Sequence, residues 1–391
     1  MLFEPFKLKN CEMRNRIVMA PMTRNQSPGG IPTEEVARYY ERRAKGEVGL
    51  IITEGIELSH KSSSAYPNVP RLDSEEARDG WKKVISGIKE NNGSVIAQLW
   101  HCGGFRKLGM GPDPDVPGYT ASGLVKPGKK VAHEMTADDV KEAIEAYASD
   151  AEICENLGFD GVEIHGAHGY LIDNFFWEGT NIREDIYGGS IEKRSNFVKE
   201  IVEAIRSRVT NNFIVGLRFS QWKQHDFDAK LAQTPDELEK VIMPPVNAGL
   251  DYLHSSMRRF WESEFPDSKE NLAYWTKKIS DITTIGVGSV GLDSETIVAV
   301  ATPAAPAVAI TFTSPPLKSI VETLPAVPTT TPSSLIVNPP IAPRPLAVIP
   351  VKAEPSPAKA VAVTVPPLKV NDPESSNTPA VPVTTTRPDV K

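Results

Sequence analysis

The sequence predicts an α/β fold of the TIM (β/α)8 type, with no recognisable eighth strand and with a disordered tail rich in Pro, Ala and Thr. Over roughly the first 298 residues, seven short Val/Ile-rich runs alternate with segments of helical period. This alternation is typical of a parallel sheet with crossover helices, either a barrel or a doubly wound sheet. Polar or glycine residues follow nearly every run, at the strand ends where barrel enzymes hold their chemistry, and this recurrence favours the barrel.

The predicted strands are short apolar runs that stop at Pro, Gly or a polar side chain. They comprise residues 17–20, 48–53, 94–101, 161–165, 214–219, 251–254 and 283–291. The first run stops at Pro21, which cannot donate a hydrogen bond to a ladder. A short hairpin or lid is expected over residues 1–16, and a long Gly/Pro loop over residues 102–133.

The helices between the strands begin at good capping residues. Thr33, Ser74 and Thr136 can each accept a hydrogen bond from the first helical turn, and Pro235 suits the first position of a helix that starts after Thr234. The expected helices cover residues 33–45, 74–91, 136–157, 190–208, 234–248 and 269–282.

The composition argues against several classes of protein. The chain has 391 residues and a net charge of −7, with no basic stripe to favour nucleic acid. It has no apolar run long enough to span a bilayer, and its N-terminus lacks the apolar core of a secretory signal. Cys11, Cys102 and Cys154 show no C-x-x-C spacing, which argues against a disulfide framework and fits a reducing cytosol. We therefore expect a cytoplasmic protein without a nucleic-acid or membrane partner; assembly into a homo-oligomer stays open.

The most informative stretch follows the fourth predicted strand. It places His165, His168 and Tyr170 beside Gly166 and Gly169, which permit the positive φ of a sharp turn. Three ring side chains can therefore crowd into one pocket at the C-terminal mouth of the sheet. Taken alone, the pattern also fits a metal pair without its other ligands, or a hydrogen-bonded loop.

Five motifs occur in a fixed order at successive strand exits. They are Ala20-Pro-Met-Thr23, Gln98-Leu-Trp-His101, His165-Gly-Ala-His168-Gly-Tyr170, Asn181-x-Arg183-x-Asp185-x-Tyr187-Gly-Gly-Ser190 and Gly216-Leu-Arg218. In these motifs the first 298 residues resemble the Old Yellow Enzyme family of FMN-dependent ene-reductases, which are TIM-barrel NAD(P)H:flavin oxidoreductases. The resemblance implies FMN as the cofactor and NADH or NADPH as the hydride donor.

The resemblance also implies which residues surround the FMN. They are Pro21, Met22, Thr23, Gly55, Gln98, Arg218, Gly288 and Ser289. Thr23 would bind the flavin carbonyl next to N5, Gln98 the pyrimidine edge, and Arg218 the N1/O2 region, where reduced flavin is close to anionic. Gly55 would let the backbone approach the ring, and Gly288 and Ser289 would offer N–H groups to the phosphate.

Each of these roles has a structural alternative. Thr23 also suits a helix cap or a turn, Gln98 also suits a purely internal hydrogen bond, and Arg218 also suits an ion pair with Glu163.

For the substrate, the resemblance implies a clamp and a proton donor. His165 and His168 would hold an enone carbonyl or a nitro oxygen, and Tyr170 would protonate the α-carbon as a general acid. Trp100 would line the substrate pocket, with ordinary core packing as an equal alternative. No metal is expected, because a third ligand at sensible spacing is missing. The run from Asn181 to Ser190 is interpreted as a structural loop, in which Glu178, Arg183 and Asp185 pair or cap locally.

The composition changes sharply near residue 298. All 27 glycines lie at or before Gly291, and Phe312 is the only aromatic residue in 299–391, a segment that holds 20 of the 34 prolines. Such a segment has little large apolar surface to bury. We therefore divide the chain into an FMN-binding barrel domain, 1–298, that is incomplete at its C-terminus, and a low-complexity tail, 299–391.

The tail also departs from the family pattern. The family adds an eighth strand and a Gly-Arg pair that grips the phosphate; residues 307–312 suit a strand in principle, but Ser314-Pro-Pro follows them. Three explanations remain open: a frameshifted gene, a genuine disordered appendage, or a strand supplied by a partner chain. An appendage would carry P-x-x-P motifs of the kind that SH3 or WW domains bind.

Together these features predict an FMN-dependent oxidoreductase that takes hydride from NAD(P)H and reduces the activated C=C bond of α,β-unsaturated carbonyl or nitro compounds. The expected loss of the phosphate grip makes impaired activity part of the prediction. The alternative is a flavin-poor barrel that acts at most as an interaction protein through its Pro-rich tail.

Overall fold

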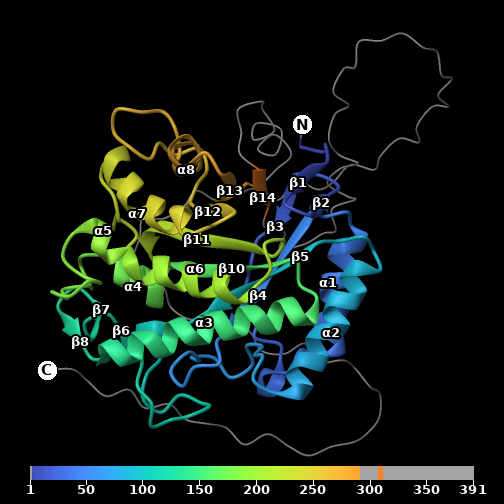
Figure 1. The fold of residues 1–391 in the computed structure, drawn as a ribbon, viewed down its shortest axis with the longest axis horizontal. Coiled ribbons are helices and arrows are strands. Elements are labelled where there is room, and N and C mark those ends of the chain that lie inside the picture. The colour runs from blue at the N-terminus through green and yellow to red at the C-terminus, as the bar shows by residue number, and fades with distance from the viewer. Residues whose placement is uncertain (1, 291–306, 311–391) are drawn as a thin grey trace, which may run out of the picture. The chain divides into compact units, whose positions relative to one another are not determined.

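The computed structural model describes residues 2–290 and the backbone of residues 307–310. Eight parallel strands close into a barrel in the order β3-β4-β5-β10-β11-β12-β13-β14, with helices around it (Figure 1). The strands are β3 Ile17–Met19, β4 Leu50–Glu57, β5 Val95–Trp100, β10 Gly161–His168, β11 Ile214–Lys223, β12 Tyr252–Ser256, β13 Thr283–Val287 and β14 Ala307–Ile310. The barrel prediction is confirmed, and all seven predicted strands are present.

The expectation that the barrel lacks an eighth strand is wrong. Strand β14 pairs in parallel with β13, where Ile285 lies opposite Ala307, and with β3, where Val308 lies opposite Ile17. The run Ala-Val-Ala-Ile has the apolar, partly β-branched character of a strand with neighbours on both sides. The prediction gave more weight to the Ser-Pro-Pro that follows the run than to the run itself. The remainder of the predicted tail lies outside the described residues, so its disorder and its P-x-x-P motifs stay predictions.

The helices follow the predicted order. They are α1 Glu34–Lys45, α2 Glu75–Lys89, α3 Ala137–Leu157, α4 Leu171–Phe176, α5 Ile191–Arg194, α6 Asn196–Arg208, α7 Pro235–Asn247 and α8 Leu272–Ser280. The predicted caps are confirmed: Thr33, Ser74 and Thr136 each accept a hydrogen bond from a backbone N–H of the first turn. The helix expected over 190–208 is divided into α5 and α6 at Ser195.

A short hairpin closes the N-terminal end of the barrel, and further short elements lie in the loops between the strands and helices. The predicted N-terminal hairpin is confirmed as β1 Phe6–Leu8 and β2 Cys11–Met13. Its Leu8, Cys11 and Met13 belong to the same buried cluster as inward-facing residues of the barrel strands, so the hairpin seals the N-terminal end. The long loop 102–133 contains the 3-10 turn η2 Gly103–Phe105 and the short strands β6 Tyr119–Thr120, β7 Leu124–Lys126, β8 Lys129–Lys130 and β9 His133–Glu134. A second 3-10 turn, η1 Pro28–Gly30, precedes α1.

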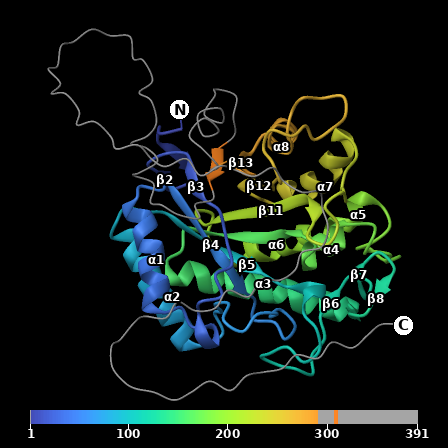
Figure 2. The same cartoon turned by 180° about the vertical axis from the view of Figure 1, so that it is seen from behind.

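Most of the apolar core lies between the strands and the surrounding helices. Helices α1 and α2 lie side by side on one flank, and α3 lies against α6 (Figures 1 and 2). Among the described residues, no helix has the length and apolar character to cross a bilayer. Because the β1–β2 hairpin covers the N-terminal end of the barrel, the C-terminal end is the one available for a site.

The closing strand gives a test. Replacing Val308 by Pro removes a backbone N–H from a strand with a neighbour on each side, so a ladder hydrogen bond is lost whichever neighbour accepts it. We expect Val308→Pro to lower the free energy of unfolding by about 1–3 kcal/mol, the cost of leaving a buried backbone acceptor without its donor, measured by urea denaturation. Val308→Ala keeps the N–H and should cost clearly less; equal losses in the two variants would argue against β14 as a paired strand.

Candidate active site

The two histidines and the tyrosine of the central stretch meet at the C-terminal end of β10. The ring centroids of His165 and His168 are 5.3 Å apart, and those of His165 and Tyr170 are 5.0 Å apart. Trp100, from the end of β5, lies 5.0 Å from the Tyr170 ring. These four side chains were predicted to share one pocket, and the structure brings them together.

The turn that carries them is built differently from the expectation. Positive φ angles occur at Gly169 (φ 87°) and at His168 itself (φ 66°), not at Gly166. Gly166 instead lies at a tight packing position, where a Cβ would come within 2.8 Å of Leu217 Cδ1 and 3.1 Å of the Arg218 carbonyl oxygen. The strand also runs three residues beyond its predicted end at His165, with a register shift between Gly166 and His168.

Burial sets the protonation of these groups. Desolvation, with the charge of Arg218, lowers the pKa of His165 to about 3 and the pKa of His168 well below its ordinary value. Desolvation also raises the pKa of Tyr170. Near neutral pH the site therefore holds two neutral imidazoles, each with one N–H, and a protonated phenol.

Tyr170 is held from several sides. Its ring lies 4.7 Å from that of Phe105, and its hydroxyl oxygen accepts a 2.9 Å hydrogen bond from Gln224. Phe105 belongs to the long loop, which is organised by the buried Arg106. Within the described part of the chain, the Arg106 guanidinium donates only to backbone carbonyls, among them that of Val116 at 2.9 Å.

A buried ion pair fixes the turn between His168 and Tyr170. Lys223 Nζ lies 2.8 Å from Asp173 Oδ1, and both side chains are fully buried. The other oxygen of Asp173 accepts a hydrogen bond from the N–H of Gly169. Desolvation raises the pKa of Asp173 to about 6, although Lys223 acts in the opposite direction.

The floor of the site contains a buried carboxylate, Glu163, which accepts three hydrogen bonds. The donors are Gln98 Nε2 at 2.8 Å, Tyr252 Oη at 3.0 Å and His254 Nδ1 at 2.8 Å. Tyr252 reaches it across Gly216, where a Cβ would meet the tyrosine ring at 2.1 Å. Burial alone would raise the pKa of Glu163, but the charge of His254, the hydrogen bonds and the charge of Arg218 hold it below the ordinary value.

Arg218 lies beside this carboxylate without an ion pair to it within residues 2–290. Its Nη2 donates to Ser256 Oγ at 3.1 Å, and its Nε is buried without a hydrogen-bond partner among the described residues. The side chain is 8% exposed. A buried guanidinium with a free N–H at the strand ends is suited to an anionic or electron-rich ligand.

Comparison with known proteins identifies the family. Residues 1–313 match the model of the NADH:flavin oxidoreductase / NADH oxidase family. The chain belongs to that family.

Individual relatives agree with this assignment. The chain is 33% identical to 12-oxophytodienoate reductase 7 of Oryza sativa subsp. japonica over 277 residues, which are 66% of this chain and 69% of the relative. The structure of morphinone reductase in complex with tetrahydroNAD matches with a TM-score of 0.68 and 26% identity over 79% of this chain and 86% of that one. An old yellow enzyme homologue from Zymomonas mobilis, 24% identical, has the same fold, with a TM-score of 0.69 over 79% of this chain and 88% of that one. This chain is thus an FMN-dependent oxidoreductase with NAD(P)H as hydride donor.

The described residues fit FMN in this flavin oxidoreductase. Gln98 and Arg218 face the same end of the barrel on β5 and β11, and the free Nε of Arg218 matches an electron-rich acceptor. Pro21 and Met22 are half-buried and Thr23 is exposed just beyond β3, as suits residues that a ligand would cover. Gly288 and Ser289, after β13, both have positive φ.

Two of the predicted FMN residues have structural partners as well. Gln98 donates to Glu163, which is the internal hydrogen bond named as its alternative. A Cβ at Gly55 would meet the Trp100 ring at 2.7 Å, so this glycine is already required for packing. Trp100 is 2% exposed and its ring stacks against that of Tyr66, so both interpretations of Trp100 stand.

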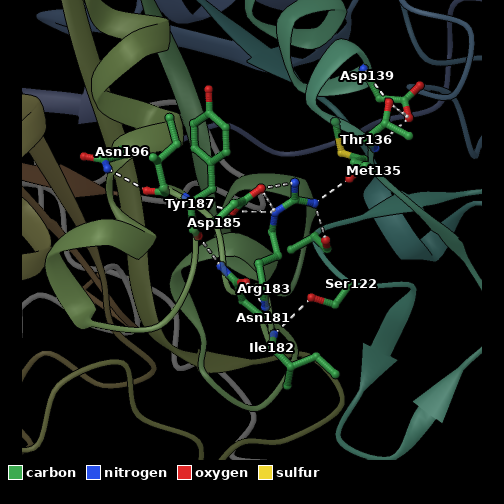
Figure 3. Close-up of polar contacts among 12 residues, drawn as sticks. Ser122, Met135, Thr136, Asp139, Asn181, Ile182, Arg183, Asp185, Tyr187 and Asn196 are labelled. Carbon is green, nitrogen blue, oxygen red and sulfur yellow. Dashed lines mark hydrogen bonds and ion pairs between the residues drawn. The ribbon is translucent and has the colours of Figure 1, made fainter.

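In the loop from Asn181 to Ser190, the predicted local pairing of Arg183 with Asp185 is confirmed. Figure 3 shows Arg183 between the carboxylate of Asp185 and the carbonyl of Met135, which lies between β9 and α3. Ile182 N–H donates to Ser122 Oγ at 3.0 Å (Figure 3). Arg183 therefore pairs locally and also ties this loop to residues 121–135.

Sequence reasoning missed several supporting residues. Ser256 contacts both Arg218 and His168, and Lys223 and Gln224 hold the turn and Tyr170. Strand β11 was expected to end at Phe219 but continues to Lys223, and this extension supplies Lys223 and leads into Gln224. The polar run Ser-Gln-Trp-Lys after Phe219 was the available signal.

The buried ion pair predicts a pH-dependent variant. In Lys223→Met the Asp173 charge is left buried without its partner, and we expect a loss of about 3–5 kcal/mol in the free energy of unfolding near pH 8. Without the cation the pKa of Asp173 rises further above 6. A carboxyl whose pKa is higher in the folded than in the unfolded chain stabilises the fold as pH falls. The loss should therefore shrink between pH 8 and pH 5.5, measured by denaturant midpoints.

The control is the double variant Lys223→Met/Asp173→Asn, which has no buried charge at this position. Its stability deficit should be nearly independent of pH. A single-variant deficit that stays constant from pH 8 to 5.5 would contradict the assignment of Asp173 as an uncompensated charge.

Proposed function

We propose that this flavin oxidoreductase reduces the activated C=C bond of α,β-unsaturated carbonyl or nitro compounds. The observation that carries the proposal is the convergence of two neutral histidines and one protonated tyrosine, with ring centroids about 5 Å apart, at one barrel mouth. Neutral N–H groups suit a carbonyl or nitro oxygen, and a phenol suits proton transfer to carbon. The name of the rice relative, a reductase, agrees with this class of reaction.

Bound FMN would supply the hydride-transfer chemistry between NADH or NADPH and the substrate. We assign its binding to Gln98 and Arg218 at the base, to Pro21, Met22 and Thr23 at one edge, and to Gly55 where the backbone approaches the ring. Gly288 and Ser289 offer backbone N–H groups to the phosphate. Arg218 supplies a fixed positive charge, which favours the reduced cofactor because that form is close to anionic.

His165 and His168 hold the substrate oxygen and draw electron density away from the β-carbon. Nδ1 of His165 lies 3.4 Å from the N–H of Ala167, an orientation that leaves Nε2–H of His165 to donate to substrate. Because desolvation keeps both rings neutral, this clamp does not titrate near neutral pH. Trp100 forms one wall of the pocket beside Tyr170.

Tyr170 is the proton donor in this scheme. Gln224 donates to its oxygen, and the Tyr170 hydroxyl also hydrogen-bonds that of Tyr66. In this scheme the phenol hydrogen turns from Tyr66 toward the α-carbon of a bound enone. A raised pKa keeps that hydrogen in place at neutral and mildly alkaline pH.

The three free thiols are buried, which agrees with the cytoplasm as the proposed location. Homo-oligomer formation and recognition of the Pro-rich tail by SH3 or WW domains stay predictions, and the described residues add nothing in favour of a purely non-catalytic protein.

Removing the Tyr170 hydroxyl separates the two half-reactions. We expect Tyr170→Phe to keep its yellow FMN absorbance and its rate of flavin reduction by NAD(P)H, because the hydroxyl takes no part in that step. Oxidation of the reduced enzyme by an enone such as 2-cyclohexenone should slow by about 10²-fold, the usual contribution of a general acid. Stopped-flow absorbance of the flavin measures both rates.

The comparison variant is Tyr66→Phe, which removes the half-buried hydroxyl that hydrogen-bonds Tyr170 but leaves the proton donor itself in place. Its effect on the oxidative rate should therefore be the smaller one. Equal oxidative rates in Tyr170→Phe and the wild type would remove Tyr170 from its role. Failure of the wild-type reduced flavin to react with any enone or nitroalkene would refute the proposed substrate class.

A further inference from the structure

Ser256, the last residue of β12, lies between the cofactor side and the substrate side of the site. Its Oγ is 3.1 Å from Arg218 Nη2 and 2.8 Å from His168 Nε2, and the residue is 2% exposed. No other hydrogen bond of this hydroxyl is found among the described residues. Its backbone carbonyl accepts a 3.0 Å bond from Trp222 Nε1, which fixes the end of the strand.

Among Arg218, Ser256 and His168, only one arrangement gives the buried hydroxyl hydrogen of Ser256 a partner. A guanidinium can only donate, so Ser256 Oγ accepts from Arg218. The hydroxyl has one hydrogen, and the remaining neighbour is His168 Nε2. If the hydroxyl donates to that nitrogen, Nε2 is an acceptor and the ring proton resides on Nδ1.

The orientation of the His168 ring does not depend on this hydroxyl alone. The centroid of the Trp222 ring lies 4.5 Å from that of the His168 ring. The backbone N–H of His168 donates to Ser220 Oγ at 2.9 Å. Ser220 in turn donates to the Trp222 carbonyl at 2.7 Å. Removing the Ser256 hydroxyl should therefore change which nitrogen carries the proton more than it moves the ring.

We propose that Ser256 is a positioning residue that holds His168 in the Nδ1–H tautomer and so aims an N–H at the substrate oxygen. The substrate role of His168 rests on the proposed function; the tautomer assignment does not. In this arrangement the hydrogen-bond chain Arg218–Ser256–His168 links the residue assigned to the flavin base with the residue assigned to the substrate clamp. With Nε2–H on His165, each histidine then presents one donor to the same oxygen.

The test is the tautomer itself, read by ¹H–¹⁵N correlation of the full chain loaded with FMN and labelled with [¹⁵N]histidine. The His168 signals are assigned by their absence in His168→Asn. We expect Nδ1–H in the wild type and in Ser256→Thr, which keeps a hydroxyl. Ser256→Ala removes the donor to Nε2, and there we expect a shift to the Nε2–H form.

Ser255→Ala is the matched control, because Ser255 is the neighbouring buried serine of β12 and bonds Thr276 instead, at 2.9 Å. Its His168 tautomer should be that of the wild type. An Nε2–H signal in the wild type, or an unchanged Nδ1–H signal in Ser256→Ala with FMN still bound, would overturn the proposal.

A binding measurement separates this inference from the proposed function. If His168 Nδ1–H holds the substrate oxygen, the KM for 2-cyclohexenone in Ser256→Ala should rise about five- to tenfold, the value of one hydrogen bond, and Ser256→Thr should restore most of it. A tautomer change as predicted, with no enone turnover in any form of the enzyme, would refute the proposed substrate while leaving the role of Ser256 intact. A tautomer change without any change in KM would refute the link from Ser256 to substrate binding.

Discussion

The mouth of this barrel depends on one buried negative charge, that of Glu163. Taking a carboxylate out of water costs several kcal/mol unless hydrogen bonds and opposite charge compensate it. Here Gln98, Tyr252 and His254 all donate to it, and Arg218 supplies positive charge nearby. The compensation has a geometric consequence: side chains from β5, β11 and β12 are held around one point, and two of them, Gln98 and Arg218, are those assigned to the flavin.

On the substrate side, too, buried charged groups hold neutral hydrogen-bond donors in place. Arg218 hydrogen-bonds Ser256, which in turn hydrogen-bonds His168. The Asp173–Lys223 ion pair fixes the turn that carries Tyr170. Desolvation keeps the two histidines of the clamp neutral and the phenol protonated. These groups are therefore in the protonation states that the proposed ene reduction needs across the neutral pH range, without a group that must titrate.

Much of this arrangement could be predicted from the sequence, because it depends on local signals. Apolar runs that end in Pro21, Gln98 or His165 mark strand exits, and Thr33 or Thr136 mark helix starts; the parallel topology then brings the exits together. The failures concern long-range pairing. Ala307–Ile310 forms the eighth strand because β13 and β3 pair with it, and the local apolar signal was outweighed by the Ser-Pro-Pro that follows. Lys223 and Ser256 were missed because their roles exist only through Asp173 and His168, residues 50 and 88 positions away. Glu163 was considered only as a partner of Arg218, whereas its hydrogen bonds go to three other residues.

The most direct test of the buried charge is the two-electron midpoint potential of bound FMN in Glu163→Gln. The substitution keeps the shape of the side chain and removes its charge, so Arg218 is no longer neutralised and the nearly anionic reduced flavin is favoured. The potential should rise by about 30 mV, which corresponds to about a tenfold change in the reduction equilibrium. A potential that is unchanged or lower, in a variant that remains folded and binds FMN, would show that the Glu163 cluster does not set the electrostatics of the flavin site.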